Sequence, residues 1–189
     1  MPQEWLHDSQ IHNICHEIWK TQKDQVNTRI ISEYPVILSL LLVKLQQFVP
    51  QSGIWFFPIN MGNCHWTLLC LECNNSNYKA LYFDPGGAAA PLLLSQTLRQ
   101  LRIQFVDLLQ KVQYDNFQCG IWVCWAVDRI LDHRARNLPL ISFSLHQLVR
   151  VNSGNSRHWL ENNQLIALVR QEFSNRLLAS KQRGTLLLI

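Results

Sequence analysis

Three short segments rich in aromatic and β-branched residues stand in the middle of the chain, and they constrain its fold more than any other feature. Clusters of turn-forming residues separate them, as expected for strands of a sheet. The segments are Ile54–Ile59, Trp66–Leu71 and Tyr78–Phe83. The second and third are joined through Asn74-Asn75-Ser76-Asn77, which predicts a hairpin. We therefore expect a sheet at the centre of the fold.

Segments with helical spacing of apolar residues flank this predicted sheet. Asp8 can cap the first helix, which carries Ile11, Ile14, Cys15, Ile18 and Trp19. Further helices are predicted over Pro35–Phe48, Leu92–Ile103, Ile121–His133, Ser144–Val151 and His158–Leu178, and a further strand over Phe105–Val112. This order predicts an α+β fold in which helices flank a central sheet.

Composition and charge favour one folded domain over residues 1–189 and exclude several classes. Apolar residues make up 48% of the chain, which is ample for a core. The net charge of +4 is scattered, without the basic stripe typical of nucleic-acid binding. The longest apolar run, Val36–Val43, is far shorter than the roughly 20 residues of a membrane span. The polar, acidic start Met1–Asp8 leads us to expect no secretory signal, and six unevenly spaced cysteines suggest a reducing, intracellular compartment. We expect a monomer.

The segment from Gln113 to Cys124 holds the first candidate for chemistry. Cys119 opens a predicted helix, whose N-terminus stabilises a nucleophilic thiolate. Gly120 follows it and would let a substrate backbone approach closely. The amide of Gln113 can point at an oxyanion beside the sulfur. A buried structural thiol is the alternative, and this segment alone leaves both interpretations open.

Two strand ends can supply a base and an acid. His65 enters a predicted strand directly after a turn, and Asp84 ends the next strand. Adjacent strand ends would place Asp84 beside His65, where a carboxylate fixes the tautomer and stabilises the charged imidazole. Singly, such residues are more often turn or capping residues, but together with Cys119 they favour a catalytic triad. This hypothesis requires the sulfur to lie within hydrogen-bonding reach of the imidazole, and not to be sealed in the core.

These pieces, in this order, resemble the ubiquitin-like-protein protease superfamily (clan CE), which includes SUMO proteases, the adenovirus protease and bacterial deubiquitinase effectors. The family shows a His-Trp pair on a strand, an Asp ending the next strand, and a Gln-to-Cys-Gly segment. Here the matches are His65-Trp66, Asp84 and Gln113 through Cys119-Gly120, together with the similar Trp5-Leu6-His7-Asp8 and Phe57-Pro58-Ile59-Asn60. The resemblance covers about residues 4–135, and 142–189 would form a C-terminal helical extension.

The resemblance implies a papain-like α+β fold with a central mixed sheet, and cleavage after the Gly-Gly tail of ubiquitin or a ubiquitin-like protein such as SUMO or NEDD8. It implies His65, Asp84 and Cys119 as catalytic residues, and Gln113 with the Cys119 backbone N–H as oxyanion hole. Trp66, Gly120 and Gln118 would bind substrate, with Trp66 walling a tunnel that admits only glycines. No metal or cofactor is expected. The short chain resembles the bacterial branch, which favours ubiquitin and an effector secreted into host cytoplasm.

Two residues depart from the family pattern, and several other functions are disfavoured by the residues present. Gln118 stands where the family usually has Asp, and Asp115 where Asn is usual. An acetyltransferase of the same clan typically carries Glu as its acid, so Asp84 favours proteolysis. A non-catalytic module that only binds a modifier would not need His65, Asp84, Gln113 and Cys119 together, so the presence of all four disfavours this function. A zinc site is disfavoured, because Cys70 and Cys73 would point to opposite faces of a strand.

Overall fold

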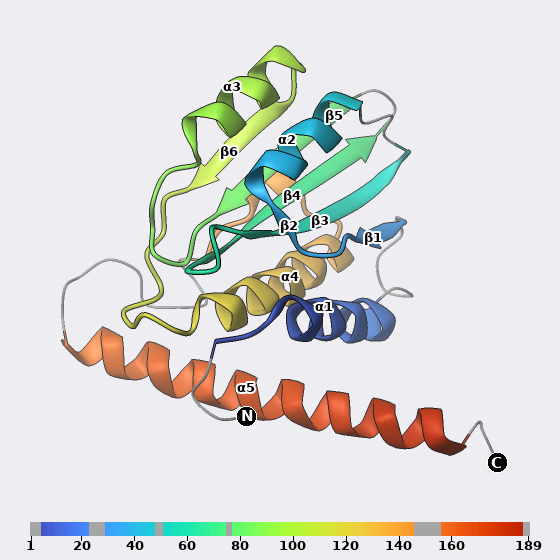
Figure 1. The fold of residues 1–189 in the computed structure, drawn as a ribbon, viewed down its shortest axis with the longest axis vertical. Helices are drawn as coiled ribbons and strands as arrows, with labels where there is room; N and C mark the ends of the chain where they lie inside the picture. The colour runs from blue at the N-terminus through green and yellow to red at the C-terminus, as the bar shows by residue number, and fades with distance from the viewer. Residues whose placement is uncertain (1–4, 23–28, 48–50, 75–76, 146–155, 187–189) are drawn as a thin grey trace.

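The computed structural model describes residues 5–22, 29–47, 51–74, 77–145 and 156–186. A single sheet stands at the centre, with helices on both of its faces (Figure 1). In chain order, the elements are α1 (Asp8–Gln22), β1 (Ile30–Ser32), β2 (Val36–Ile37), α2 (Leu38–Gln47), β3 (Gly53–Asn60), β4 (Trp66–Asn74), β5 (Asn77–Phe83), α3 (Leu92–Gln100), β6 (Gln104–Leu108), α4 (Cys119–Ala135), the 3₁₀ turn η1 (Leu140–Ser142) and α5 (Ser156–Leu186).

The sheet is mixed and has the strand order β1-β3-β4-β5-β6, with the short β2 also paired to β3. The predicted hairpin is confirmed, since β4 and β5 are antiparallel and Leu68 lies opposite Phe83. β3 is also antiparallel to β4, whereas β6 runs parallel to β5 and both β1 and β2 run parallel to β3. The α+β prediction with a central mixed sheet is therefore confirmed. The pairing puts the start of β4 and the end of β5 at the same edge of the sheet.

Two cores lie on the two faces of the sheet. The face that carries Leu68 and Cys70 packs against α1 and α4, and the opposite face packs against α2 and α3. Because successive strand residues point to opposite faces, Cys70 belongs to the first core and Cys73 to the second. The prediction that these two thiols diverge is confirmed. α4 is buried along most of its length, including Trp122, because α1, α5 and the sheet pack around it.

The longest helix, α5, lies against α1 and α4 on the side away from the sheet (Figure 1). Ile166, Val169 and Phe173 recur at the helical spacing of one face, and all three enter the core that α1 and α4 share. The predicted helix over His158–Leu178 is confirmed and extends further at both ends. Within the described residues, no helix combines the length and the apolar character that a membrane crossing requires.

Several predicted boundaries differ from the structure for physical reasons. The second helix begins at Leu38 and not at Pro35, because Val36 and Ile37 pair with β3 as a short strand. β1 was not predicted. The strand predicted to reach Val112 ends at Leu108, after which Gln110 N–H bonds to the Leu108 carbonyl and turns the chain. The helix predicted over Ser144–Val151 lies largely outside the described residues.

Candidate active site

The edge of the sheet where β4 begins and β5 ends brings a histidine and a carboxylate together. His65 Nε2 lies 2.8 Å from Asp84 Oδ1, so the predicted proximity of these two side chains is confirmed. The N–H of Gly86 also donates to Asp84 Oδ1, over 2.6 Å. Asp84 is buried and His65 is partly exposed. The turn after β5 therefore fixes the carboxylate, and the carboxylate fixes the orientation of the imidazole.

The residues that precede α4 form a loop, residues 112–118, which we call the nucleophile loop. Its first part is tied to the turn after β5, because the N–H groups of Val112 and Gln113 donate to the Pro85 carbonyl over 3.0 and 2.9 Å. Its last part is shaped by Asp115, whose Oδ1 accepts the N–H groups of Phe117 and Gln118. The acid-bearing turn and the start of α4 are thereby held side by side.

His65 forms hydrogen bonds on both sides. Hydrogen bonding to Asp84 and then to Cys119 raises the pKa of His65 to about 10, against the opposing effect of burial. Because Nε2 is engaged by Asp84, the other ring nitrogen is left for the sulfur. The structure thus brings His65, Asp84 and Cys119 together, and it favours the imidazolium form of His65 at neutral pH.

The thiol of Cys119 is covered, contrary to what the catalytic hypothesis required. The residue is 0% exposed and belongs to the core between the sheet and α1. Leu6 and Trp66 belong to the same core and lie beside the next residue, Gly120, and the indole N–H of Trp66 donates to the Leu6 carbonyl over 3.1 Å. In this conformation, a substrate carbonyl cannot reach the sulfur without movement of the surrounding chain.

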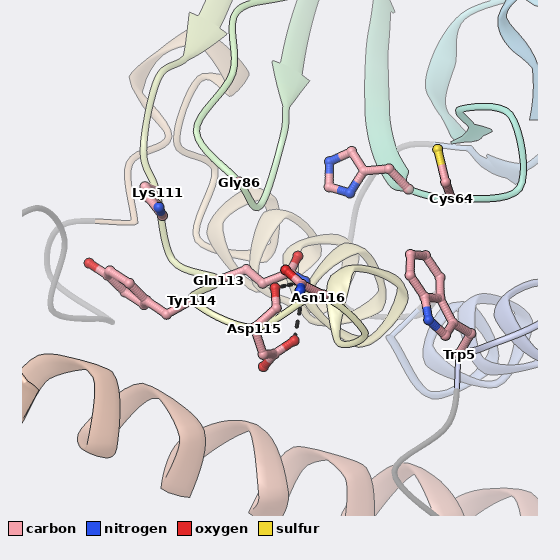
Figure 2. Close-up of a pocket in the computed structure, with 9 residues that line it drawn as sticks. Trp5, Cys64, Gly86, Lys111, Gln113, Tyr114, Asp115 and Asn116 are labelled. Carbon is pink, nitrogen blue, oxygen red and sulfur yellow. Dashed lines mark hydrogen bonds between the residues drawn. The ribbon is translucent and has the colours of Figure 1, made fainter.

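Gln113 is also engaged within the loop (Figure 2). Its Nε2 donates to the Asp115 backbone carbonyl over 2.8 Å and to Asp115 Oδ1 over 3.2 Å. Its Oε1 is buried and has no hydrogen-bond partner among the described residues. The amide N–H groups therefore face the loop and not an open space beside the sulfur. The arrangement is that of a closed site, in which the predicted oxyanion donor is held by its own loop.

The three residues predicted to bind substrate have packing contacts in this conformation. Trp66 is buried. A Cβ added at Gly120 would lie 3.1 Å from both Leu6 Cβ and Ile11 Cδ1, so this glycine permits close packing of α4 against the N-terminal segment. Gln118 donates through Nε2 to Asn163 Oδ1 on α5 over 3.3 Å. Within the described residues, Gln118, the residue before α4, makes no side-chain cap hydrogen bond.

A pocket of about 440 Å³ opens beside the imidazole (Figure 2). His65, Gln113 and Asp115 line it together with residues that sequence reasoning did not name as part of a site; these are Trp5, Cys64, Lys111 and Tyr114. Lys111 Nζ lies 5.3 Å from the centre of the Tyr114 ring. Of these residues only Trp5 belongs to a sequence motif, the N-terminal one, and that motif was the one available signal.

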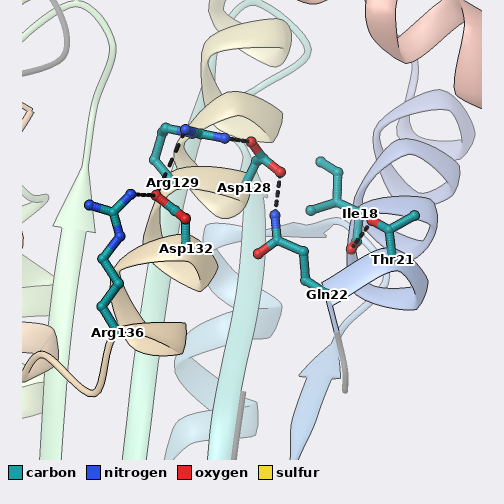
Figure 3. Close-up of polar contacts among 7 residues, drawn as sticks. All are labelled: Ile18, Thr21, Gln22, Asp128, Arg129, Asp132 and Arg136. Carbon is teal, nitrogen blue, oxygen red and sulfur yellow. Dashed lines mark hydrogen bonds and ion pairs between the residues drawn. The ribbon is translucent and has the colours of Figure 1, made fainter. Parts of the chain in front are cut away.

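The far end of α4 is anchored to α1 by polar contacts (Figure 3). Gln22 Nε2 donates to Asp128 Oδ1 over 2.5 Å, and Asp128 also pairs with Arg129. Asp132 accepts a hydrogen bond from Arg136 over 2.8 Å at the more exposed edge of the same network. These contacts, with the buried apolar face of α4, fix the helix whose first residue is Cys119.

The fold defines a class. The chain has the clan CE fold of the ubiquitin-like-protein-specific cysteine proteases, as the resemblance in sequence had implied. No protein-family model and no curated protein matches the sequence. The fold is therefore established by solved structures that differ widely from this chain in sequence.

Particular solved structures show how far this similarity extends. A de-sumoylating protease superposes with a TM-score of 0.63 at 13% identity, covering 97% of this chain and 85% of that one. A mutant of Xanthomonas XopD gives a TM-score of 0.58 at 15% identity, with 91% and 99% covered. The SUMO protease Ulp1 gives 0.51 at 16% identity, with 93% and 80% covered. An ASFV protease is matched over only 62% of its own length.

Proposed function

We propose that the protein is a thiol isopeptidase that cuts after the C-terminal glycine of ubiquitin or a ubiquitin-like protein. The observation that carries this proposal is the hydrogen-bonded set of His65, Asp84 and Cys119, with the thiol at the first residue of α4. A base that favours its protonated form beside a thiol at a helix N-terminus suits acyl transfer. The shared fold supports the same class of activity.

The proposed reaction uses these three residues in two steps. His65 already holds the thiol proton as an imidazolium, and the Cys119 sulfur, as a thiolate, bonds to the carbonyl carbon of the terminal glycine while the carbonyl electron pair moves to the oxygen. His65 then gives its proton to the leaving amine as the C–N bond breaks, which leaves a thioester. Water adds to the thioester while His65 accepts its proton, and the C–S bond breaks to release the carboxylate and restore the thiol. Asp84 stabilises the imidazolium throughout.

Burial of the thiol implies an opening step before the chemistry. We propose that the modifier tail enters through the pocket beside His65 and displaces the cover around Leu6 and Trp66. In the same step, Gln113 would exchange its bonds to Asp115 for one to the developing oxyanion, which the Cys119 backbone N–H also stabilises. Trp66 and Trp5 would then flank the tail. A site that assembles only with its substrate gives selectivity at some cost in rate.

Three related proteins, ubiquitin, SUMO and NEDD8, are candidates for the modifier that is cleaved. Ulp1 is a SUMO protease, and a structure of XopD is described as bound to ubiquitin; the latter gives a TM-score of 0.53 at 14% identity. We propose ubiquitin first, with SUMO and NEDD8 as alternatives. Action in a reducing compartment, such as the cytoplasm of a host cell, is part of the proposal, and all six cysteines are free thiols in the structure.

A panel of modifier-tail reagents tests the proposal. The purified protein should release a fluorophore from the C-terminus of at least one of ubiquitin, SUMO and NEDD8, and should form an adduct at Cys119 with the matching propargyl-tailed probe. Cys119→Ala should abolish turnover and leave modifier binding measurable. Inertness toward all three modifiers would refute the proposal, and labelling by acetyl-CoA in place of cleavage would indicate a transferase.

A further inference from the structure

The turn that follows β5 carries the acid of the site, and we call residues 84–90 the acid-bearing turn. The N–H of Gly87 donates to the backbone carbonyl of Asp84 over 2.9 Å, which closes the turn directly behind the carboxylate. Gly87 has a φ of 79°, a backbone conformation that residues with a side chain rarely adopt. The turn is therefore a tight one, through which a displacement of its far end reaches Asp84.

The acid-bearing turn is in close contact with the segment that enters the nucleophile loop. A Cβ added at Gly87 would lie only 2.8 Å from Lys111 Cβ and 3.0 Å from the Lys111 backbone nitrogen. Figure 2 shows Gly86 at the tip of the turn, beside the segment that carries Lys111 and Gln113. Together with the two hydrogen bonds to the Pro85 carbonyl, this contact ties the position of the turn to that of the loop.

One side chain of β6 holds the far end of the acid-bearing turn. Asp107 lies opposite Tyr82 in the parallel pairing of β6 with β5. Its Oδ2 accepts the N–H of Ala90 over 2.8 Å. Its other oxygen, Oδ1, is buried and has no hydrogen-bond partner among the described residues. Burial disfavours the charged carboxylate and raises the pKa of Asp107. The hydrogen bond that this side chain does accept therefore comes from the turn that carries the acid.

We propose that Asp107 is a positioning residue of the active site: it fixes the acid-bearing turn, and the turn holds Asp84 against His65. This inference rests on the proposed function, in which His65 and Asp84 act on the substrate. A hydrogen bond weakens steeply as its geometry departs from the ideal. Loss of the acceptor at position 107 would free the far end of the turn and loosen the 2.8 Å contact between Asp84 Oδ1 and His65 Nε2.

The imidazole itself reports the state of this contact. Hydrogen bonding to Asp84 is the largest of the causes that raise the pKa of His65 to about 10. The ionisable groups that surround the imidazole are Asp84 after β5, Cys119 at the start of α4, Cys64 before β4, and Lys111, Tyr114 and Asp115 across the pocket. A substitution at position 107 leaves all of these groups in place, so it can act on His65 only through the turn or through its own charge.

The experiment follows the imidazole signals of His65 against pH by NMR in the whole chain, assigned by their loss in His65→Gln. The wild-type midpoint should lie near pH 10. Asp107→Leu removes the acceptor and should lower the midpoint by about one unit. Asp107→Asn removes the charge but keeps an oxygen for the Ala90 N–H, so it should restore most of the wild-type midpoint. Asp132→Leu is the matched control, because it makes the same chemical change at a remote position on α4 and should leave the midpoint unchanged.

An unchanged midpoint in folded Asp107→Leu would overturn the inference. Equal falls in Asp107→Asn and Asp107→Leu would overturn it as well, because the charge and not the hydrogen bond would then act on His65. If Asp107→Leu does not fold, Ala90→Pro removes the N–H donor in its place, and an unchanged midpoint there would decide against the inference. A protein that shows the expected midpoints but cleaves no modifier would refute the proposed function and leave the role of Asp107 toward His65 intact.

Discussion

At the scale of single residues, His65 has two partners that both favour its protonated form. Asp84 accepts its hydrogen bond on one side, and Cys119 lies on the other. An imidazole alone has a pKa near 6.5, whereas here the pKa of His65 is raised to about 10. The imidazolium is therefore the form that meets an arriving substrate, and it is lost only as the pH rises through about 10.

Replacing the acid tests this directly. In the wild type, kcat/KM for the cleaved modifier should hold up to about pH 9 and fall as His65 loses its proton near pH 10. In Asp84→Asn the largest cause of the raised pKa is gone, so this alkaline fall should begin closer to neutrality and kcat should drop by about a hundredfold or more. Asp132→Asn, far from the site, should leave both unchanged. An identical alkaline limb in Asp84→Asn would contradict the assigned pairing.

The sequence could predict the meeting of His65 and Asp84, because an antiparallel hairpin brings the start of one strand beside the end of the next. It could not predict the cover over Cys119. Which side chains close over a thiol depends on how Leu6 and Trp66 pack at the beginning of α4, beside Gly120, and this packing joins segments far apart in the chain. The engagement of Gln113 by Asp115 was likewise invisible, since a residue type does not reveal the direction of its amide.

At the scale of elements, α4 carries the nucleophile and is held at both ends. Its beginning meets the nucleophile loop, and its later turns are joined to α1 through Asp128 and to β4 through an ion pair between Arg134 and Glu72 of 2.7 Å. This helix could be predicted from the sequence, because its nearly continuous run of apolar residues indicates a buried helix. The short strands β1 and β2 were not, because two or three residues carry no periodic pattern and form strands only by pairing with β3.

The tie between α1 and α4 gives a stability prediction. Asp128 is 5% exposed, and its replacement by Ala leaves Gln22 and Arg129 without this partner. We expect Asp128→Ala to lower the free energy of unfolding by about 1–3 kcal/mol, measured by urea denaturation. Asp132→Ala removes a more exposed carboxylate from the same helix and should cost about 0.5 kcal/mol or less. Equal losses in the two variants would show that the buried link is not what anchors the helix.

At the scale of the whole molecule, α5 completes the core. The family resemblance ended near residue 135, yet Ile166, Val169 and Phe173 pack in the same cluster as α1 and α4. Helical spacing in the sequence predicted α5 as a helix. It could not predict the surface that α5 would meet, because an apolar stripe specifies that a face is buried without specifying its partner.

A pair of substitutions on this helix separates packing from helix formation. Phe173 is 2% exposed, and Phe173→Ala should lower the free energy of unfolding by about 3–5 kcal/mol. Leu168 is 70% exposed, so Leu168→Ala should change it by about 0.5 kcal/mol or less. Thermal and urea unfolding measure both. Should Phe173→Ala be as stable as Leu168→Ala, α5 would be an appendage and not a part of the core.

Burial of the Cys119 thiol has a consequence for how fast the protein is inactivated by oxidation. Peroxide converts an exposed thiolate first to a sulfenic acid and then to irreversible products. A sulfur without solvent contact is shielded from this attack for as long as the site stays closed. We expect hydrogen peroxide to inactivate the resting protein slowly and the same protein much faster during turnover, as followed by residual cleavage after quenching with catalase. The closed site would then protect the resting protein from oxidation by peroxide, because the Cys119 sulfur becomes exposed only while substrate is being turned over.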